Sequence, residues 1–155
     1  MPERFHATAI ALAGKAALIR GASGSGKSDL ALRCLAIAPT PLIPHQARLI
    51  SDDYVELERR GRVLIAVAPP AIRGRVEVRG LGIVTVEPSA EAEVALLVDL
   101  VSGAEVSRYP DPMPHETVQG MALPILRLSP FEASAPVKLL LALAERIAGS
   151  PPGQD

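Results

Sequence analysis

Gly21-Ala22-Ser23-Gly24-Ser25-Gly26-Lys27-Ser28 fits the phosphate-binding loop pattern G-x-x-x-x-G-K-[ST] at every fixed position. The glycines let successive backbone N–H groups turn inward around an anion, and a helix that follows adds its N-terminal partial positive charge. We expect Lys27 to reach the β- and γ-phosphates and the Ser28 hydroxyl to ligate Mg²⁺. The stretch therefore predicts a nucleoside triphosphate site at residues 21–28.

The flanking sequence separates this motif from a chance Gly/Ser-rich turn. Residues 16–20 are short and apolar, as in a buried strand, and residues 30–35 carry apolar side chains at helical spacing. A further strand over 6–10 and a turn at Gly14-Lys15 predict a hairpin that leads into the loop. Most phosphate-binding loops are instead entered from a strand of a parallel βαβ unit, so the hairpin sets this chain apart.

Two adjacent acidic residues follow the next predicted strand. Residues 48–51 are apolar and β-prone, and they end in Asp52-Asp53. Acidic residues in this place after a phosphate loop usually manage Mg²⁺ and an attacking hydroxyl. Neighbouring side chains on a strand point to opposite faces, so we expect one carboxylate at the nucleotide and the other holding the loop or the metal shell. The alternative is an exposed Asp-Asp turn.

A second charged pattern lies between residues 75 and 86, after a predicted hairpin over 54–67. Polar and apolar residues alternate so that Arg75, Glu77 and Arg79 share one face. Composition alone favours a solvated, charge-paired strand face. The Gly-Leu-Gly of residues 80–82 favours close backbone approach to a bulky anion instead.

The rest of the chain predicts further sheet and one more helix. Residues 93–101 form a buried strand, residues 102–122 are loop-rich, and residues 123–128 form a last strand. Ser134 is expected to cap a helix that starts at Pro136 and packs on the sheet without a chemical role. These elements predict an α+β fold with a mainly antiparallel or mixed sheet.

Composition narrows the class of protein. The chain has 155 residues, 48% hydrophobic content, a net charge of −1 and no tryptophan, with 3% aromatic residues. We expect one domain over 1–148, a disordered tail over 149–155, a cytoplasmic location, and neither a nucleic-acid nor a membrane partner. Cys34, the single cysteine, lies on the apolar stripe of the predicted helix and is interpreted as a buried core thiol.

Taken in order, these motifs resemble the catalytic C-terminal domain of HPr kinase/phosphorylase, also called HPr serine kinase, in its short single-domain proteobacterial form. The resemblance is carried by His6, the phosphate loop, Leu49-Ile50-Ser51-Asp52-Asp53-Tyr54-Val55 and Val76-Glu77-Val78-Arg79-Gly80-Leu81-Gly82-Ile83. It implies a P-loop kinase with a fold similar to phosphoenolpyruvate carboxykinase. It also implies ATP and Mg²⁺ as cofactors and a serine of the phosphocarrier protein HPr, or an HPr-like carrier, as the acceptor.

The resemblance further assigns roles to single residues. Asp53 is expected to take the proton from the acceptor serine and to return it in the reverse reaction. Glu77 is expected to ligate Mg²⁺ together with Ser28, and Lys27 to neutralise the transferred phosphoryl group. His6 is expected beside the catalytic carboxylate, and Arg108 resembles a further catalytic arginine of the family.

The chain also departs from the family pattern. The N-terminal domain of full-length members is not found here, and an arginine-containing loop linked to dephosphorylation is replaced by residues 129–134, which contain no arginine. These differences predict weakened phosphorylase activity and leave open whether the family's hexamer is kept. Two other functions remain open: a P-loop kinase for a small molecule, favoured by a deep pocket at Asp53, and a nucleotide sensor that transfers nothing.

Overall fold

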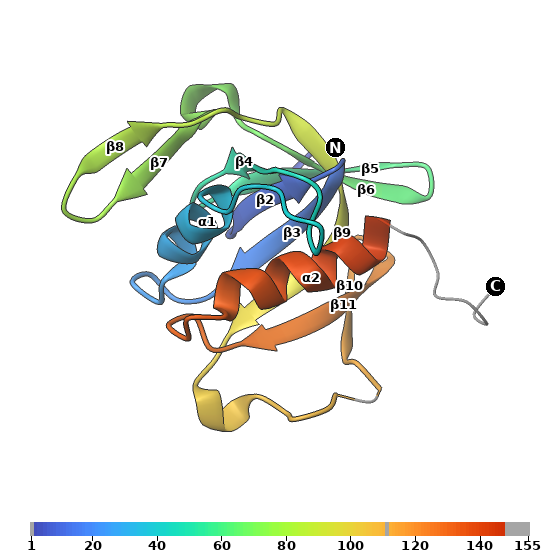
Figure 1. Ribbon diagram of the computed structural model, residues 1–155. Coiled ribbons are helices and arrows are strands. Elements are labelled where there is room, and N and C mark those ends of the chain that lie inside the picture. Colours follow the sequence, from blue (N-terminus) through green and yellow to red (C-terminus); the bar gives the residue numbers. More distant parts are fainter. Residues whose placement is uncertain (1, 111, 148–155) are drawn as a thin grey trace.

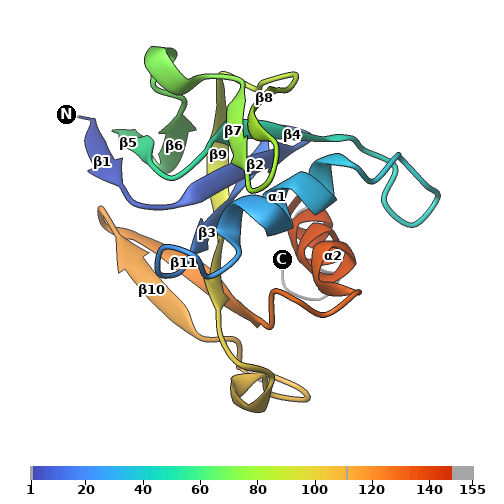
Figure 2. The same ribbon diagram turned by 90° about the vertical axis from the view of Figure 1, so that its left-hand side faces the viewer.

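The computed structural model describes residues 2–110 and 112–147, and the predicted tail over 149–155 lies outside these residues. Within the described part, a curled mixed sheet carries α-helices on one face (Figures 1 and 2). The helices and strands in chain order are β1 (Glu3–Phe5), β2 (Thr8–Leu12), β3 (Lys15–Arg20), α1 (Lys27–Leu35), β4 (Ala47–Ser51), β5 (Val55–Arg60), β6 (Val63–Val67), β7 (Arg75–Val78), β8 (Gly82–Thr85), β9 (Glu91–Leu100), β10 (His115–Val118), β11 (Met121–Leu128) and α2 (Ala135–Ile147). The predicted α+β class is confirmed.

Strands β2 and β3 form the predicted hairpin that leads into the phosphate loop. They pair antiparallel along their whole length. The connecting residues Ala13 and Gly14 both have positive φ, 47° and 82°, which suits a two-residue turn between strands of right-handed twist. Since β3 ends at Arg20, the hairpin places Gly21 at the edge of the sheet, at the start of the loop that leads to α1.

Strand β9 is the centre of the sheet. One of its edges runs parallel to β3, and the other pairs first antiparallel with β6 and then parallel with β11. The strand order is β1-β5-β6-β9-β3-β2-β4, with β10 joined to β11 outside this path. Because β9 changes partner along one edge, β5–β6 and β10–β11 diverge from each other, and the sheet curls (Figure 2).

The core consists of two buried clusters, one on each face of the sheet. Ile10 and Leu12 belong to the cluster covered by α1 and α2, whereas their neighbours Ala9 and Ala11 belong to the cluster on the other face. This alternation is expected of a strand buried on both sides. The second cluster is rich in alanine. A core of aliphatic residues and alanine follows from the low aromatic content.

Two differences from the sequence prediction concern the C-terminal third. Residues 102–122 are not all loop, because β10 pairs antiparallel with β11 in a further hairpin. The last helix begins at Ala135, one residue before Pro136, and packs on the sheet as predicted.

Among the described residues no helix is long and apolar enough to cross a membrane.

Cys34 provides a test of the packing between the two helices. Its side chain is fully buried, and burial raises the pKa of its thiol to about 12. Because the thiolate is the reactive form, we expect no reaction of the folded protein with a disulfide reagent at pH 8, and complete reaction after unfolding in guanidinium. Absorbance of the released chromophore measures this, and fast labelling of the folded protein would contradict the packing of α1.

Candidate functional site

The phosphate loop depends on three of its glycines, Gly21, Gly24 and Gly26. Gly24 and Gly26 have φ of 81° and 103°, a region that side chains disfavour. A Cβ on Gly26 would also lie 3.1 Å from the ring of Phe131, and one on Gly21 would lie 2.4 Å from Ser25 Oγ. The loop is closed by a turn in which Ser25 N–H donates to Ala22 O at 3.0 Å. The backbone therefore has the curvature that the motif predicts.

Lys27 lies beneath this loop with its side chain buried. Its ammonium donates to Gly21 O at 2.8 Å and to Ala22 O at 3.1 Å. Two of its three N–H groups thus hold the loop, and the third has no protein partner in the described part of the chain. The ammonium is positioned by the loop and keeps a donor and a positive charge for an anion.

Asp52 is the residue that joins the site to the fold. Its Oδ1 accepts hydrogen bonds from Ser28 Oγ at 2.6 Å and from Thr8 Oγ1 at 3.0 Å. Its Oδ2 accepts from the backbone N–H of Glu77 at 3.1 Å. The carboxylate is nearly buried and connects β2, the start of α1 and β7. Of the two adjacent carboxylates, this is the one that holds the loop.

Asp53 has the opposite setting. Its side chain is 69% exposed, and its Oδ1 lies 3.1 Å from Nε2 of His6, in the segment between β1 and β2. The predicted neighbourhood of His6 and Asp53 is therefore observed. The two adjacent aspartates face different surroundings as predicted, but a turn separates them and not the period of a strand, because β4 ends at Ser51.

The backbone at Asp53 is strained. Its φ is 69°, and Tyr54 N–H donates to Asp52 O at 2.8 Å, so Asp53 is the central residue of a positive-φ γ-turn. Such turns are rare and cost about 1–3 kcal/mol. Two hydroxyls hold this one: Thr8 Oγ1 accepts from Asp53 N–H, and Ser51 Oγ donates to Tyr54 O. The turn directs the Asp53 carboxylate away from the core.

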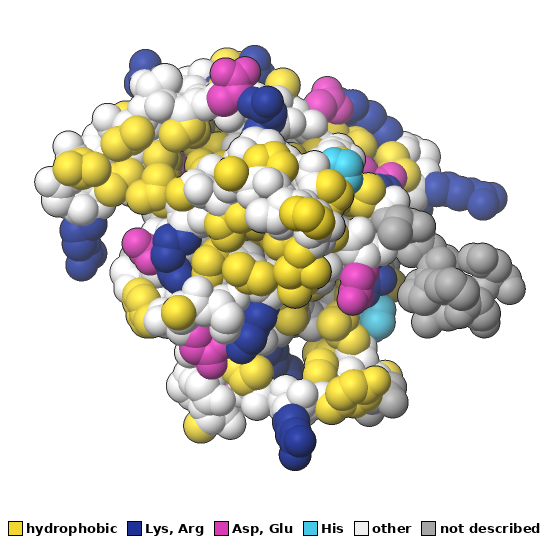
Figure 3. Space-filling model, in the orientation of Figure 1, with side chains coloured by type: hydrophobic (Ala, Val, Ile, Leu, Met, Phe, Trp, Pro, Cys, Tyr) yellow, Lys and Arg dark blue, Asp and Glu magenta, His cyan; other side chains and the backbone are white. Residues whose placement is uncertain are grey.

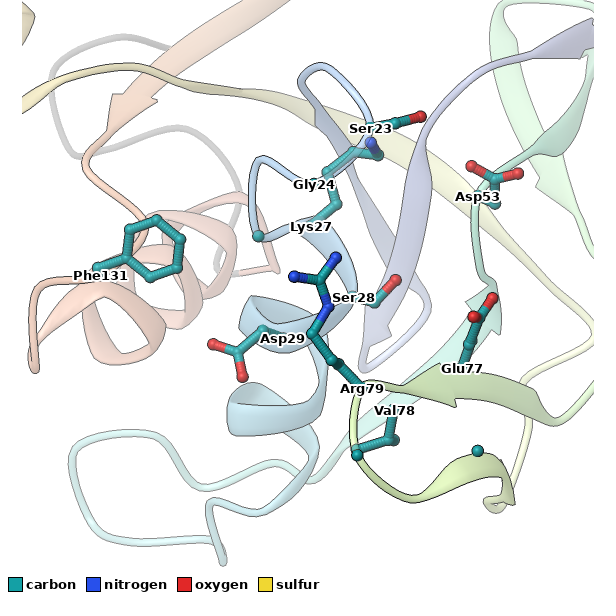
Figure 4. A pocket seen from close by; sticks show the side chains of 13 residues that line it. Ser23, Gly24, Lys27, Ser28, Asp29, Asp53, Glu77, Val78, Arg79 and Phe131 are labelled. Carbon is teal, nitrogen blue, oxygen red and sulfur yellow. The ribbon is translucent and has the colours of Figure 1, made fainter.

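The β7–β8 hairpin forms the far wall of the site. Glu77 and Arg79 both line the same hollow as the phosphate loop, Glu77 from β7 and Arg79 from the turn after it, whereas Arg75, predicted on the same face, does not line it (Figure 4). Among the described residues no ion pair joins Glu77 to Arg75 or Arg79, so this is not a charge-paired strand face. The hairpin is tied to the sheet through the Glu77 N–H bond to Asp52.

These elements enclose a hollow of about 920 Å³. Ser28, Asp53 and Glu77 present oxygen atoms to it, with Asp52 directly behind Ser28. Oxygen donors suit Mg²⁺, which binds through one or two protein groups together with phosphate oxygens and water. In residues 2–110 and 112–147 no group of three His, Cys, Asp or Glu side chains is arranged to hold a metal alone. The donor set therefore fits a cation that arrives with a phosphate ligand.

The start of the phosphate loop is braced by an ion-pair cluster. The Arg20 guanidinium donates to Asp99 at 2.7 and 3.0 Å and to Glu116 at 2.7 Å. The hydrogen bond from Arg20 lowers the pKa of the Glu116 carboxyl. The cluster links β3, β9 and β10 where Gly21 begins the loop.

Two residues stand apart from the sequence prediction. Arg108 does not line this hollow; it lies at a second, smaller one together with Arg127 and Lys138, so its catalytic role stays a prediction. Phe131, in the connection between β11 and α2, lines the main hollow, although no motif pointed to it. Phe131 contacts Gly26, which is distant in sequence, and a single aromatic residue in a loop belongs to no pattern from which this contact could be predicted.

Comparisons with known proteins extend this description. A family model described as HPr serine kinase C-terminal domain matches residues 2–124. An HPr kinase/phosphorylase of Chloroherpeton thalassium is 29% identical over 157 residues, covering 94% of this chain and 43% of that protein. The HPr kinase/phosphorylase of Limosilactobacillus reuteri is 30% identical over 145 residues, which cover 86% of this chain and 41% of that protein. This chain thus spans about two fifths of the length of these relatives.

A solved structure is similar over almost the whole chain. The HPr(Ser) kinase/phosphatase of Coxiella burnetii matches with a TM-score of 0.75 and 23% identity, covering 94% of this chain and 92% of that one. At this identity the likeness shows the fold. The predicted P-loop kinase architecture is thereby confirmed.

The hydrogen bonds of Asp52 predict a stability effect. Replacing Asp52 by Ala leaves the Glu77 N–H and the Thr8 hydroxyl without their acceptor, so we expect Asp52→Ala to lower the free energy of unfolding by about 1–3 kcal/mol. Urea denaturation measures this. Asp53→Asn is the matched control, because the neighbouring exposed side chain should change stability by less than about 0.5 kcal/mol. Equal stability of the two variants would contradict the role of Asp52.

Proposed function

The chain belongs to the HPr serine kinase C-terminal domain family, and from this membership and the geometry of the site we propose that it transfers the terminal phosphoryl group of Mg-ATP to a serine of an HPr-type phosphocarrier protein. The phosphate loop would hold the triphosphate, and the rim around Asp53 would receive the serine.

The exposure of Asp53 is the observation that carries this proposal. A base for a small-molecule acceptor is expected inside a pocket that surrounds the acceptor. Here the carboxylate is 69% exposed at the rim of the hollow, and its neighbour His6 is 56% exposed. A serine on the surface of another protein can reach such a carboxylate. The open setting therefore favours a protein acceptor over the small-molecule kinase.

Apolar surface beside the site supports the same conclusion. Leu81 and Ile83, at the end of the β7–β8 hairpin, are 79% and 66% exposed, and Figure 3 shows hydrophobic side chains at that end of the molecule. Exposed apolar groups next to a reactive site are typical of a surface that a protein partner covers.

Each residue of the site has a separate role in the proposed reaction. Asp53 takes the proton of the serine hydroxyl, whose oxygen attacks the terminal phosphorus while ADP leaves. Lys27 offers its charge to the phosphoryl group in transit, and Ser28 and Glu77 would hold Mg²⁺, with Asp52 fixing the Ser28 hydroxyl. The cation, when bound, neutralises phosphate charge. His6 orients the Asp53 carboxylate through their contact.

The loop at residues 129–134 bears on the reverse reaction. Phosphorolysis needs a site for inorganic phosphate next to the phosphoserine, and this loop supplies no arginine. Arg33 reaches the loop from α1, but its guanidinium is taken up by Pro130 O, Glu132 O and Asp29. We therefore propose that the forward reaction dominates. Hexamer formation and the role of Arg108 remain predictions from the family.

The division of roles predicts the behaviour of Asp53→Asn. The amide accepts no proton, so we expect phosphoryl transfer to fall by about 10²–10⁴-fold while ATP binding stays unchanged. The protein is incubated with Mg-ATP and a panel of purified HPr-type carriers, and the intact mass of each carrier is followed. A gain of one phosphate on a serine, absent with Asp53→Asn, is the expected result. Lys27→Ala should weaken both binding and transfer.

The same experiment separates the other functions. ATP consumption without modification of any carrier would support a small-molecule acceptor. Binding without turnover would support a nucleotide sensor. Loss of ATP affinity in Asp53→Asn would contradict the division of roles between Asp52 and Asp53.

A second prediction concerns the reverse direction. With serine-phosphorylated carrier and inorganic phosphate, we expect pyrophosphate to form far more slowly than the carrier is phosphorylated under Mg-ATP, because Arg33 is engaged by the loop. A coupled assay for pyrophosphate measures the rate, with a full-length family member as the positive control. Comparable forward and reverse rates would contradict this assignment.

A further inference from the structure

Phe131 is an exposed aromatic side chain at the nucleotide end of the molecule. It is 72% exposed, although it lines the hollow that holds the phosphate loop. Its ring lies against Gly26, close enough that a Cβ there would come within 3.1 Å of it. Among the described residues that line the hollow, no other is aromatic. Single exposed apolar side chains are common on protein surfaces, but this ring lines the hollow beside the phosphate loop, where a bound ligand would cover it.

The backbone on both sides of Phe131 is held in place. Arg33, on α1, donates to the carbonyl oxygens of Pro130 and Glu132, the two neighbours of Phe131. Arg33 is itself oriented by Asp29 Oδ2, at 2.9 Å from its Nε. A side chain whose flanking residues are both anchored to the helix after the phosphate loop keeps its place relative to that loop. This is the preorganisation expected of a binding group.

The hollow has two chemically different ends. Asp53 and Glu77 lie on one side of the phosphate loop, and Phe131 lies on the other (Figure 4). If the terminal phosphate is transferred at Asp53, the triphosphate runs along the loop with its base directed away from the carboxylates. That direction leads to Phe131.

We propose that Phe131 is the platform on which the base of the nucleotide stacks. This inference rests on the proposed function, since the position of Asp53 sets the direction of the nucleotide. An aromatic ring offers a π-face to any base, so it selects for stacking area and not for hydrogen-bonding groups. Purine nucleotides are therefore expected to bind more tightly than pyrimidine nucleotides, with ATP and GTP close to each other.

A tryptophan at this position reports stacking directly. The chain has no tryptophan, so Phe131→Trp introduces a single indole next to Gly26. We expect its fluorescence to be quenched by ATP and GTP but not by inorganic tripolyphosphate, which binds the loop and has no base. Tyr109→Trp is the matched control, because Tyr109 is also exposed, at 81%, and does not line the hollow. Its fluorescence should not respond to either ligand.

Affinity provides an independent measurement. Titration calorimetry should show ATP binding weakened about tenfold or more in Phe131→Leu, the size expected for one lost base stack, and retained in Phe131→Tyr. Tripolyphosphate should bind the unmodified protein, Phe131→Leu and Phe131→Tyr with equal affinity. Comparing the two ligands separates base stacking from structural support of the phosphate loop, since loss of loop support would lower the affinity for both ATP and tripolyphosphate.

The outcomes distinguish this inference from the proposed function. If tripolyphosphate and ATP both bind while the indole of Phe131→Trp is not quenched and Phe131→Leu keeps its ATP affinity, the platform is wrong and the kinase proposal stands. Equal weakening of both ligands, or an effect on carrier binding alone, would also overturn the platform. If neither ligand binds the unmodified protein, both proposals fail.

Discussion

One buried carboxylate holds the site together. Asp52 accepts hydrogen bonds from Thr8 on β2, Ser28 at the start of α1 and the backbone of Glu77 on β7. Three segments far apart in the sequence thus share one acceptor, and each carries a part of the proposed chemistry. A hydrogen bond to a charged acceptor is stronger than a neutral one, and a buried donor that loses it is costly. Asp52 thus ties the start of α1 and the β7–β8 hairpin to the sheet.

Much of the architecture could be predicted because its signals are local. The phosphate loop is defined by spacing alone, and the hairpin before it by two apolar runs around Gly14. The alternation correctly placed Arg75 and Glu77 on the exposed face of β7, on either side of the buried Val76, because a strand fixes orientation two residues at a time; Arg79 lies in the turn after the strand. Asp52 and Asp53 diverge as predicted, but the cause is the turn after β4 and not strand alternation, since β4 ends at Ser51 and Asp53 has a φ of 69°.

The remainder depends on contacts that no local pattern encodes. Strand β10 was missed because His115–Val118 is largely exposed and polar and is ordered by pairing with β11. Which aspartate faces the core is decided by Thr8 and Ser28, and neither the order nor the identity of the two residues reveals it. The place of Phe131 follows from the anchoring of its loop by Arg33, a contact between distant segments. Sequence patterns thus predict most of the helices and strands, whereas contacts between distant residues decide where the side chains of the site lie.

The parallel pairing of β3 with β9 has a consequence for synthesis of the chain. Two ion pairs join these strands: Lys15 pairs with Glu93, 78 positions later in the sequence, and Arg20 pairs with Asp99, 79 positions later. Contacts of such long range form slowly, because the loop-closure entropy is lost before the pairing is gained. The phosphate loop leaves the ribosome well before β9, so during translation it lacks the strand that supports it. The strand that leads into the loop is therefore complete only after residues 91–100 have been synthesised and paired with it.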